Sequence, residues 1–263
     1  MSRQKRELEV DKRLKLAIRA AEKAGRMLVD NFDRPIKFIR KKDGSLVTKI
    51  DLKAEKIIVG LIKKYFPKDN ILAEESPNYT FDSEYRWIID PLDGTHNFIR
   101  GINIFGTSIA LQNKKEVVVG VINMPLAGGL YHAQRGKGCY LNGKRIKVSK
   151  KKIKDATIVY DSSIEKEKTA MLRVLGAMAD KIFNFRMFGS TAAGLTYVAE
   201  GKVEAEIEFN DAVWDFAAGL LLVEEAGGMV SDFKGKRWSI DTKKYVASNG
   251  KVHKDLLKCL SKK

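Results

Sequence analysis

Apolar residues in the first part of the chain follow first a helical and then an extended periodicity. Between Leu14 and Leu28 they recur every three or four residues, which predicts a helix that ends before Pro35. The same spacing over 51–66 predicts a second helix, which Pro67 stops. Shorter apolar runs then predict strands at 71–73, 86–90, 106–112 and 117–122. The first half of the chain is therefore expected to be of the α+β type.

The second half alternates between strand and helix patterns. It is preceded by Asn142-Gly143, a pair that predicts a hairpin with a type I′ turn. The lysine-rich stretch 149–154 is the best candidate boundary between the halves, although it could simply be a solvated loop. The expected strands are 156–160, 182–188, 203–208, 229–232 and 245–248, and the expected helices are 165–179, 190–199 and 213–226. Because such alternation is typical of an α/β layer, we expect one unit over 1–263, with an α+β half at 1–150 and an α/β half at 151–263.

The clearest chemical signal is the sequence Trp-Ile-Ile-Asp-Pro-Leu-Asp-Gly-Thr, which begins at Trp87. Its apolar start predicts a short buried strand that ends at Asp90, because Pro91 cannot continue a sheet. A second carboxylate, Asp93, precedes Gly94, whose following amides are expected to open a helix or a tight turn. Carboxylates beside free backbone N–H groups suit oxygen-binding cations together with a phosphate. Taken alone, however, Asp-Gly after a strand could be simple turn chemistry.

Two further acidic residues lie beside apolar segments. Glu74 directly follows the expected strand at 71–73. Asp215 lies in the first turn of the expected helix at 213–226, which ends at Gly227-Gly228, a pair suited to a C-cap. Because the helix dipole favours a carboxylate in the first turn, Asp215 could also be a helix charge and nothing more.

Together these segments resemble the inositol monophosphatase family. The stretch from Trp87 is similar to the first signature of that family, and Trp214-Asp-Phe-Ala-Ala-Gly with Glu225-Ala-Gly-Gly is similar to the second. The upstream elements and the substrate loop of the family are matched by Val47-Thr-Lys-Ile-Asp, Ala73-Glu-Glu-Ser and Gly189-Ser-Thr-Ala-Ala. All occur in the order of the family and together cover nearly the whole chain. The resemblance implies alternating layers of helices and sheets, an αβαβα sandwich of the sugar phosphatase type, with the active site between the two halves.

The acidic set Glu74, Asp90, Asp93 and Asp215 contains no histidine or cysteine. Oxygen-only ligands select hard cations, so we expect Mg²⁺, with Mn²⁺ tolerated. In one pocket these carboxylates would repel one another strongly unless cations neutralised them. Zinc is disfavoured because the three histidines, at 96, 132 and 253, have no ligand spacing. We expect His96 to be an exposed loop residue.

The resemblance also implies roles for individual residues. Two or three metal ions would be held by Glu74, Asp90, the carbonyl of Leu92, Asp93 and Asp215, with Asp90 bridging. One ion would acidify the attacking water and another would stabilise the leaving alkoxide. Thr95 and Asp51 look like the pair that orients or deprotonates this water, so Asp51, Glu74 and Thr95 are the expected catalytic residues; otherwise Asp51 is a helix N-cap after Thr48. The expected substrate contacts are Leu92, Asp93, Gly94, Thr95, Arg186, Gly189, Ser190, Thr191, Glu208 and Asp215.

The expected substrate is a small polyol or sugar phosphate, with inositol 1-phosphate preferred. Glu208 matches the position at which inositol-type members place a glutamate toward sugar hydroxyls, although it could be a surface charge on an edge strand. Arg186 could instead meet a second phosphate, so a fructose-1,6-bisphosphatase or dual-specificity enzyme stays open. A 3′-phosphoadenosine 5′-phosphate phosphatase also stays open. Sensitivity to lithium and a homodimer are further expectations from the resemblance.

The composition limits the class of protein and its expected location in the cell. The 263 residues are 44% apolar, which is ample for a core, and no stretch approaches the roughly 18 to 20 apolar residues of a membrane span. The start, Met-Ser-Arg-Gln-Lys-Arg-Glu, is not expected to be a signal peptide. Two distant cysteines, Cys139 and Cys259, are expected to be reduced and inert, and the protein to be cytoplasmic.

The net charge of +16 raises nucleic acid as a partner, and with it a non-catalytic, nucleic-acid-associated protein. Lysines are spread over the whole chain but are denser at Lys150-Lys151-Lys152 and Lys262-Lys263, and 31% of the residues are charged. Such a composition is typical of heat-adapted proteins, whose charge networks replace uncharged polar surface. We favour a thermostable charged surface over a nucleic-acid site, and a positive field would also attract anionic substrates.

Overall fold

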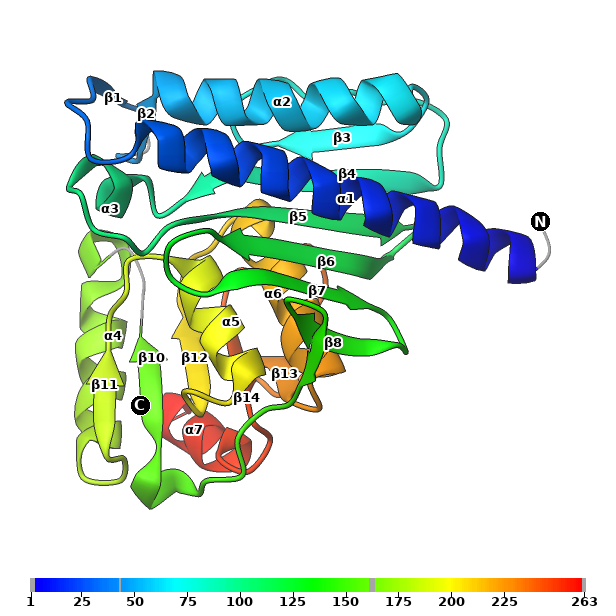
Figure 1. The fold of residues 1–263 in the computed structure, drawn as a ribbon. Coiled ribbons are helices and arrows are strands. Elements are labelled where there is room, and N and C mark those ends of the chain that lie inside the picture. Colours follow the sequence, from blue (N-terminus) through cyan, green and yellow to red (C-terminus); the bar gives the residue numbers. More distant parts are fainter. Residues whose placement is uncertain (1–2, 43, 161–163, 262–263) are drawn as a thin grey trace.

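The computed structural model describes residues 3–42, 44–160 and 164–261, and these form stacked layers of helices and sheets (Figure 1). The helices are α1 (Arg3–Asn31), α2 (Lys49–Tyr65), α3 (Thr95–Ile99), α4 (Ile164–Ala179), α5 (Thr191–Glu200), α6 (Val213–Glu225) and α7 (His253–Leu260). Helices α1 and α2 cover one face of a seven-stranded sheet, and α5 and α6 lie between this sheet and a five-stranded one. Helices α4 and α7 cover the outer face of the five-stranded sheet. The predicted αβαβα sandwich is confirmed.

The seven-stranded sheet has the strand order β3-β4-β5-β6-β7-β8-β9. Its strands are β3 (Asn70–Ala73), β4 (Tyr85–Asp93), β5 (Gly106–Asn113), β6 (Glu116–Met124), β7 (Gly129–Gln134), β8 (Gly138–Leu141) and β9 (Lys144–Ile146). Only β3 and β4 pair in parallel; the other neighbours are antiparallel. Asn142 and Gly143, between β8 and β9, have φ values of 49° and 78°. Two positive φ angles are what a type I′ turn requires, so the predicted hairpin is confirmed.

The five-stranded sheet has the order β11-β10-β12-β14-β13. Its strands are β10 (Thr157–Tyr160), β11 (Asn184–Arg186), β12 (Ala205–Glu208), β13 (Met229–Asp232) and β14 (Tyr245–Ser248). Strand β10 is parallel to β11 and β12, whereas β14 is antiparallel to β12 and β13. All the predicted strands of this half are present, although β11 is shorter than predicted. The division of the chain into halves at residue 150 stays a prediction.

Three hydrophobic clusters hold the layers together, and the alternation of side chains along β4 shows how. Trp87 and Ile89 point to the cluster under α1 and α2, while Ile88 between them belongs to the cluster around α5 and α6. This period of two is what a strand buried on both faces requires. A third cluster lies between the five-stranded sheet and the helices α4 and α7, and includes Met171 and Leu256.

The strand that carries the first acidic motif does not end at Asp90, so this prediction is wrong. β4 continues through Pro91 to Asp93, and its pairing with β5 shifts register between Asp90 and Asp93. An irregularity of this kind needs no N–H from Pro91, whose carbonyl oxygen accepts a hydrogen bond from Thr107 Oγ1 at 3.0 Å. The proline therefore redirects the strand instead of terminating it, and both carboxylates remain on β4.

Several short elements were not predicted from the sequence. These are the ribbon of β1 (Phe38–Arg40) and β2 (Leu46–Thr48), the strand β7 and the last helix, α7. Strand β1 is fully exposed, so it lacks the alternation of buried and exposed residues that marks a strand in sequence.

A buried histidine fixes α7 to the five-stranded sheet. His253 is 2% exposed, and its two ring nitrogens each lie 2.8 Å from a serine hydroxyl, Ser231 on β13 and Ser248 on β14. Burial lowers the pKa of His253 from 6.5 to about 4. The folded protein therefore holds this imidazole neutral at pH values at which the unfolded chain would protonate it.

We expect His253 to make the free energy of unfolding depend on pH. Its contribution should be complete above pH 6.5 and should be lost as pH falls toward 4, because only the unfolded state then gains the proton. The loss should be on the order of 3 kcal/mol. Urea denaturation of the wild type and of His253→Gln at several pH values measures it, and the variant should show the weaker dependence in this window. If the free energy of unfolding depended equally on pH in the two proteins within this window, the assignment to His253 would be wrong.

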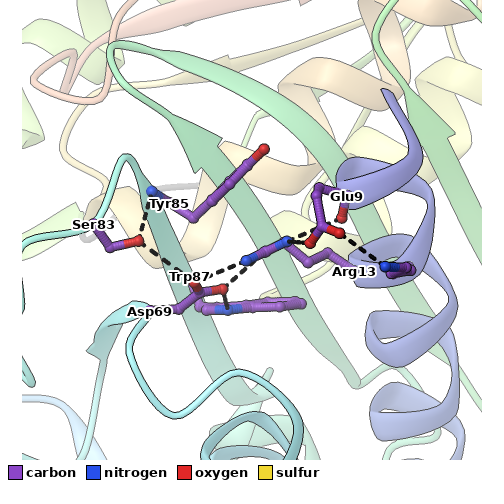
Figure 2. Close-up of polar contacts among 7 residues, drawn as sticks. Glu9, Arg13, Asp69, Ser83, Tyr85 and Trp87 are labelled. Carbon is purple, nitrogen blue, oxygen red and sulfur yellow. Dashed lines mark hydrogen bonds and ion pairs between the residues drawn. The ribbon is translucent and has the colours of Figure 1, made fainter. Parts of the chain in front are cut away.

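A buried arginine joins the first helix to the sheet (Figure 2). Arg13 is 6% exposed and donates to both carboxylate oxygens of Asp69, from Nε at 2.8 Å and from Nη2 at 3.0 Å. Its guanidinium lies 4.1 Å from the ring centroid of Phe66 and 3.9 Å from that of Tyr85. Asp69 also accepts a hydrogen bond from Trp87 Nε1 at 2.9 Å. Helix α1, the turn after α2 and strand β4 are therefore linked by one planar cation.

Because only a planar guanidinium can make this forked and stacked contact, Arg13→Lys is expected to destabilise the fold although it keeps the charge. We expect the free energy of unfolding to fall by roughly 2 kcal/mol, from the lost second hydrogen bond and the lost stacking. Urea denaturation measures this, with Lys12→Arg on the exposed side of the same helix as the control. An Arg13→Lys protein as stable as the control would rule out this role.

Candidate active site

The predicted acidic residues line one cavity at the C-terminal end of β4. The cavity has a volume of about 390 Å³. Its lining residues are Arg40, Gly44, Ser45, Leu46, Glu74, Asp90, Leu92, Asp93, Gly94, Thr95, His96, Gly189 and Asp215. The structure thus gathers Glu74, all five predicted residues from Asp90 to Thr95, Gly189 and Asp215 from distant parts of the sequence. His96 is exposed, as expected, but it belongs to the short helix α3 and not to a loop.

The alternative that Asp51 is the N-cap of α2 is wrong, because Thr48 takes that position, but Asp51 completes the capping box and also contacts Thr95. Asp51 is fully buried at the third position of the helix, and its Oδ2 accepts hydrogen bonds from the backbone N of Thr48 at 2.9 Å and from Thr48 Oγ1 at 2.5 Å. Its other oxygen, Oδ1, accepts from Thr95 Oγ1 at 2.9 Å. The capping box therefore fixes the carboxylate so that it faces Thr95. Burial raises the pKa of Asp51, which makes it a stronger base than an exposed aspartate.

The hydroxyl of Thr95 lies between two acceptors. Its Oγ1 is 2.9 Å from Asp51 Oδ1 and 2.9 Å from the carbonyl oxygen of Leu92. A hydroxyl has one hydrogen, so it can donate to only one of these at a time and keeps lone pairs for another donor. Thr95 also lines the cavity, where a water could donate to it.

Asp93 is fixed by the loop that the resemblance identifies as the substrate loop. Its Oδ2 accepts hydrogen bonds from the Ser190 hydroxyl and from the backbone N of Ala192, the latter at 3.2 Å. Ser190 is also the N-cap of α5, where its Oγ accepts from Ala193 N at 3.1 Å. The first turn of α5 and the second carboxylate of the first motif are thus one hydrogen-bonded unit.

Gly94 is required where it stands. Its φ is +79°, and a Cβ would lie 2.8 Å from the carbonyl oxygen of Ile104 and 3.4 Å from the Cβ of Ser190. It is the N-cap of α3, so the helix begins directly after it, as expected. Asn97 on that helix donates to the carbonyl oxygen of Phe188 at 2.7 Å and holds the loop before α5 against it. Backbone N–H groups of this turn can therefore approach a ligand closely.

The carboxylates of the cavity raise one another's proton affinity. Burial, followed by the charges of Glu74, Asp93 and Asp215, raises the pKa of Asp90 well above its usual range. Burial, followed by Asp211, likewise raises the pKa of Asp215, whose Oδ2 accepts from Ala212 N at 2.8 Å. Such crowding of buried anions is unfavourable without cations.

Lys41 supplies one cation, which was not predicted from the sequence. Its Nζ lies 2.8 Å from Glu74 Oε1 and 2.5 Å from Glu75 Oε1. Burial acts to lower the pKa of Lys41, but the hydrogen bonds to the two glutamates outweigh it and raise the pKa. Burial raises the pKa of Glu75 to about 7, against the opposing effect of Lys41. No sequence signal separates Lys41 from the many surface lysines, because its role depends on the turn of the β1–β2 ribbon.

The donor atoms of these residues suit a hard divalent cation, but the side chains are not arranged around a common point. All the acidic groups offer oxygen, and two of them carry the raised pKa values of anions that lack a compensating charge. Among the described residues, however, no three acidic, histidine or cysteine side chains are already gathered around a point that could hold an ion. Three of the carboxylates are instead engaged by protein groups: Glu74 pairs with Lys41, Asp93 accepts a hydrogen bond from Ser190, and Asp215 accepts one from the backbone N of Ala212. The ligand set that the resemblance implies, Glu74, Asp90, the Leu92 carbonyl, Asp93 and Asp215, therefore stays a prediction.

Four predicted substrate residues do not line the cavity. Ser190 is buried, and its hydroxyl donates to Asp93 Oδ2. Arg186 is exposed at the end of β11 and donates to the carbonyl oxygen of Phe185 at 2.7 Å. Glu208 is 1% exposed on β12, which is an inner strand, so the alternative of a surface charge on an edge strand is wrong. Thr191 is buried at the start of α5, with its Oγ1 3.3 Å from Asp211 Oδ2. Conversely, Arg40 lines the cavity and was not predicted.

Comparisons with known proteins show what the whole chain is similar to. Residues 9–263 match the model of the inositol monophosphatase family. The chain is 39% identical to the Nus factor SuhB of Escherichia coli over 250 residues, which cover 93% of this chain and 94% of that protein. It is 36% identical to the fructose-1,6-bisphosphatase/inositol-1-monophosphatase of Thermotoga maritima over 252 residues, 95% of this chain and 96% of that one. The crystal structure of the extragenic suppressor protein suhB of Bartonella henselae superposes with a TM-score of 0.91 at 36% identity, over 94% of this chain and 98% of that chain.

Two other expectations concern the rest of the molecule. Among the described residues, no helix is long and apolar enough to cross a membrane. Both cysteines are buried and free of disulfides, and burial raises the pKa of Cys139 to about 12, which keeps this thiol protonated and inert.

Proposed function

Because this chain belongs to the inositol monophosphatase family, we propose that it hydrolyses a small polyol or sugar monophosphate, with inositol 1-phosphate as the preferred substrate. The family is metal-dependent, and we propose Mg²⁺ as the ion, with two or three bound and Mn²⁺ as a substitute. The observation that supports the proposal is that one cavity is lined by the carboxylates, by the start of α3 after Gly94 and by Thr95, whose hydroxyl donates to the buried Asp51. The bound ions would acidify a water and neutralise the charge that develops on the leaving oxygen.

The side chains of this protein then have distinct tasks. We propose that the backbone N–H groups of Gly94 and Thr95 bind phosphate oxygens, because these amides begin α3 on the cavity wall. Thr95 would accept a hydrogen bond from the attacking water and donate its own hydrogen to Asp51 Oδ1. The proton would then reside on Asp51, whose raised pKa suits it as the acceptor. Ser190 would keep Asp93 oriented throughout.

A substrate panel tests the proposal. Phosphate release should be measured from inositol 1-phosphate, fructose 1,6-bisphosphate, histidinol phosphate and 3′-phosphoadenosine 5′-phosphate, with added Mg²⁺ and with excess EDTA. We expect activity only with the metal, and the highest kcat/KM for inositol 1-phosphate. Full activity in EDTA would refute the metal-dependent reaction, and preference for the adenosine compound would refute the substrate class.

Fructose 1,6-bisphosphate is the second candidate substrate, because of one feature of the cavity wall. Arg40 lines the cavity, is exposed, and donates from Nη1 to the carbonyl oxygen of Gly44 at 3.3 Å. An exposed guanidinium of this kind could pair with a second phosphate. The activity in the name of the Thermotoga maritima relative is compatible with such a substrate. Arg40 therefore replaces Arg186 as our candidate for this contact.

Glu208 and Arg40 are expected to shift the substrate preference in opposite directions. If Glu208 accepts hydrogen bonds from ring hydroxyls, Glu208→Gln should lower the ratio of kcat/KM for inositol 1-phosphate over fructose 1,6-bisphosphate by up to about tenfold. Glutamine is the appropriate replacement, because an arginine would not fit at this buried position on an inner strand. Arg40→Gln should raise the same ratio. An unchanged ratio in Glu208→Gln would place this residue outside the substrate site.

The remaining expectations are neither supported nor contradicted by these residues. The homodimer, the cytoplasmic location, thermostability and lithium sensitivity stay predictions from the sequence and the resemblance.

A further inference from the structure

Exposed lysines from three separate segments gather on one end of the molecule, far from the cavity. The connection from β9 to β10 carries Lys147, Lys150, Lys151, Lys152 and Lys154, all of them exposed. Lys202 follows α5, Lys251 precedes α7, and both are also exposed. Figure 1 shows that the connection, the end of α5 and the turn before α7 lie toward the same end of the five-stranded sheet. We call these seven lysines the basic surface.

Specific contacts hold the three segments together. Gly201 packs against the connection so closely that a Cβ there would lie 2.9 Å from Ser149 N and 3.0 Å from the carbonyl oxygen of Lys147. The Asn249 side chain donates to Ser149 Oγ and to the carbonyl oxygen of Lys151, both at 3.0 Å. Asn249 Oδ1 in turn accepts from the backbone N of Lys251 at 2.9 Å. The clustering of the lysines is therefore built into the fold.

The charge of the basic surface is poorly compensated. Within the described part of the chain, only Lys151 and Lys202 of this group have a carboxylate oxygen within 4.0 Å. Lys151 lies 3.9 Å from Glu204, which is fully buried and also accepts from Ser149 Oγ and Thr157 N. A surface adapted to heat would intersperse both signs in ion-pair networks. The basic surface has seven lysines, most of them unpaired, against one exposed carboxylate of the same connection, Asp155, and such an excess of positive charge fits an anionic partner better.

We propose that the basic surface binds the phosphate backbone of a single-stranded nucleic acid. Its lysines are spread over an irregular connection, and a flexible strand can follow such a path, whereas a duplex presents phosphates at fixed positions. The ammonium groups would contact phosphates and not base edges, so binding should depend little on sequence. This differs from the expectation drawn from the sequence, which favoured a thermostable charged surface over a nucleic-acid site although lysines are denser at Lys150-Lys151-Lys152.

The basic surface is separate from the catalytic cavity. Ser190, which binds Asp93, caps one end of α5, and Gly201 lies at the other. Ten helical residues span roughly 15 Å. A bound strand would therefore leave the cavity open, and loss of binding should leave phosphatase activity unchanged.

Fluorescence anisotropy with a labelled oligouridine of about 15 nucleotides tests this proposal at several NaCl concentrations. With about five phosphate contacts, a plot of the logarithm of the binding constant against the logarithm of the NaCl concentration should have a slope of roughly −3.5. The variant Lys150→Glu/Lys151→Glu/Lys152→Glu should bind at least about tenfold more weakly and with a smaller slope.

The matched control is Lys53→Glu/Lys56→Glu/Lys64→Glu, which makes the same change of net charge on the exposed side of α2. It should bind within about twofold of the wild type, and both variants should keep the phosphatase kcat. Equal weakening in both variants would show a net-charge effect and overturn the proposal. So would the absence of binding at low salt, or an affinity that salt does not change.

Discussion

Replacing Asp93 with asparagine is expected to lower kcat by on the order of 10³-fold at a fixed Mg²⁺ concentration, since the electrostatic contribution of a catalytic metal amounts to several kcal/mol. The reason lies in the partners of this side chain. Ser190 Oγ and Ala192 N both donate to Asp93 Oδ2. The amide oxygen of the variant must take this position, because an NH₂ group there would face two donors. The NH₂ group is then left at the position of Oδ1, where it cannot bind a cation.

The same reasoning predicts that the Asp93→Asn protein folds normally. Its amide oxygen still accepts from Ser190 and Ala192, so the melting temperature should stay close to that of the wild type. Steady-state kinetics over a range of Mg²⁺ concentrations, together with a thermal scan, separate the two effects. Asp155→Asn makes the same chemical change at an exposed position outside the cavity and is the control. Wild-type kcat in Asp93→Asn would remove this residue from the metal site.

Most acidic residues of the cavity could be predicted from sequence because they lie where a strand or helix begins or ends. Glu74 follows β3, Asp93 ends β4, and Asp215 stands in the first turn of α6. Positions of this kind are marked by local signals, an apolar run before them and glycine or proline beside them. The chemistry of the set, oxygen without nitrogen or sulfur, could also be read directly from residue type.

Contacts that depend on the order of strands could not be predicted in the same way. The burial of Glu208 follows from the position of β12 between β10 and β14, which is not the order of these strands along the chain. Lys41 reaches Glu74 and Glu75 across 33 and 34 residues, through a ribbon of two three-residue strands. Such short, exposed strands carry almost no periodicity. The predicted end of the strand at Asp90 was wrong for a related reason, because in sequence a proline in a bulge cannot be distinguished from a proline that ends a strand.

The pair of Asp51 and Thr95 should behave as one catalytic unit in a double-mutant cycle. Asp51→Asn and Thr95→Val should each lower kcat by roughly 10²- to 10³-fold, the usual contribution of a positioned general base. In the proposed mechanism the proton passes from Thr95 to Asp51, so removing either residue would break the same path. The double variant should therefore be about as slow as the slower single variant, far from the product of the two losses.

Two measurements keep this catalytic function apart from the structural one. Asp51 also completes the capping box with Thr48, so Asp51→Asn is expected to lower the free energy of unfolding by about 1 kcal/mol, which urea denaturation detects. Thr95→Ser keeps the hydroxyl between Asp51 Oδ1 and the Leu92 carbonyl oxygen and should retain most of the activity. If the losses in Asp51→Asn and Thr95→Val simply multiplied, or if Thr95→Ser were as slow as Thr95→Val, proton transfer through this pair would be excluded. Asp51 would then remain the residue that completes the capping box of α2.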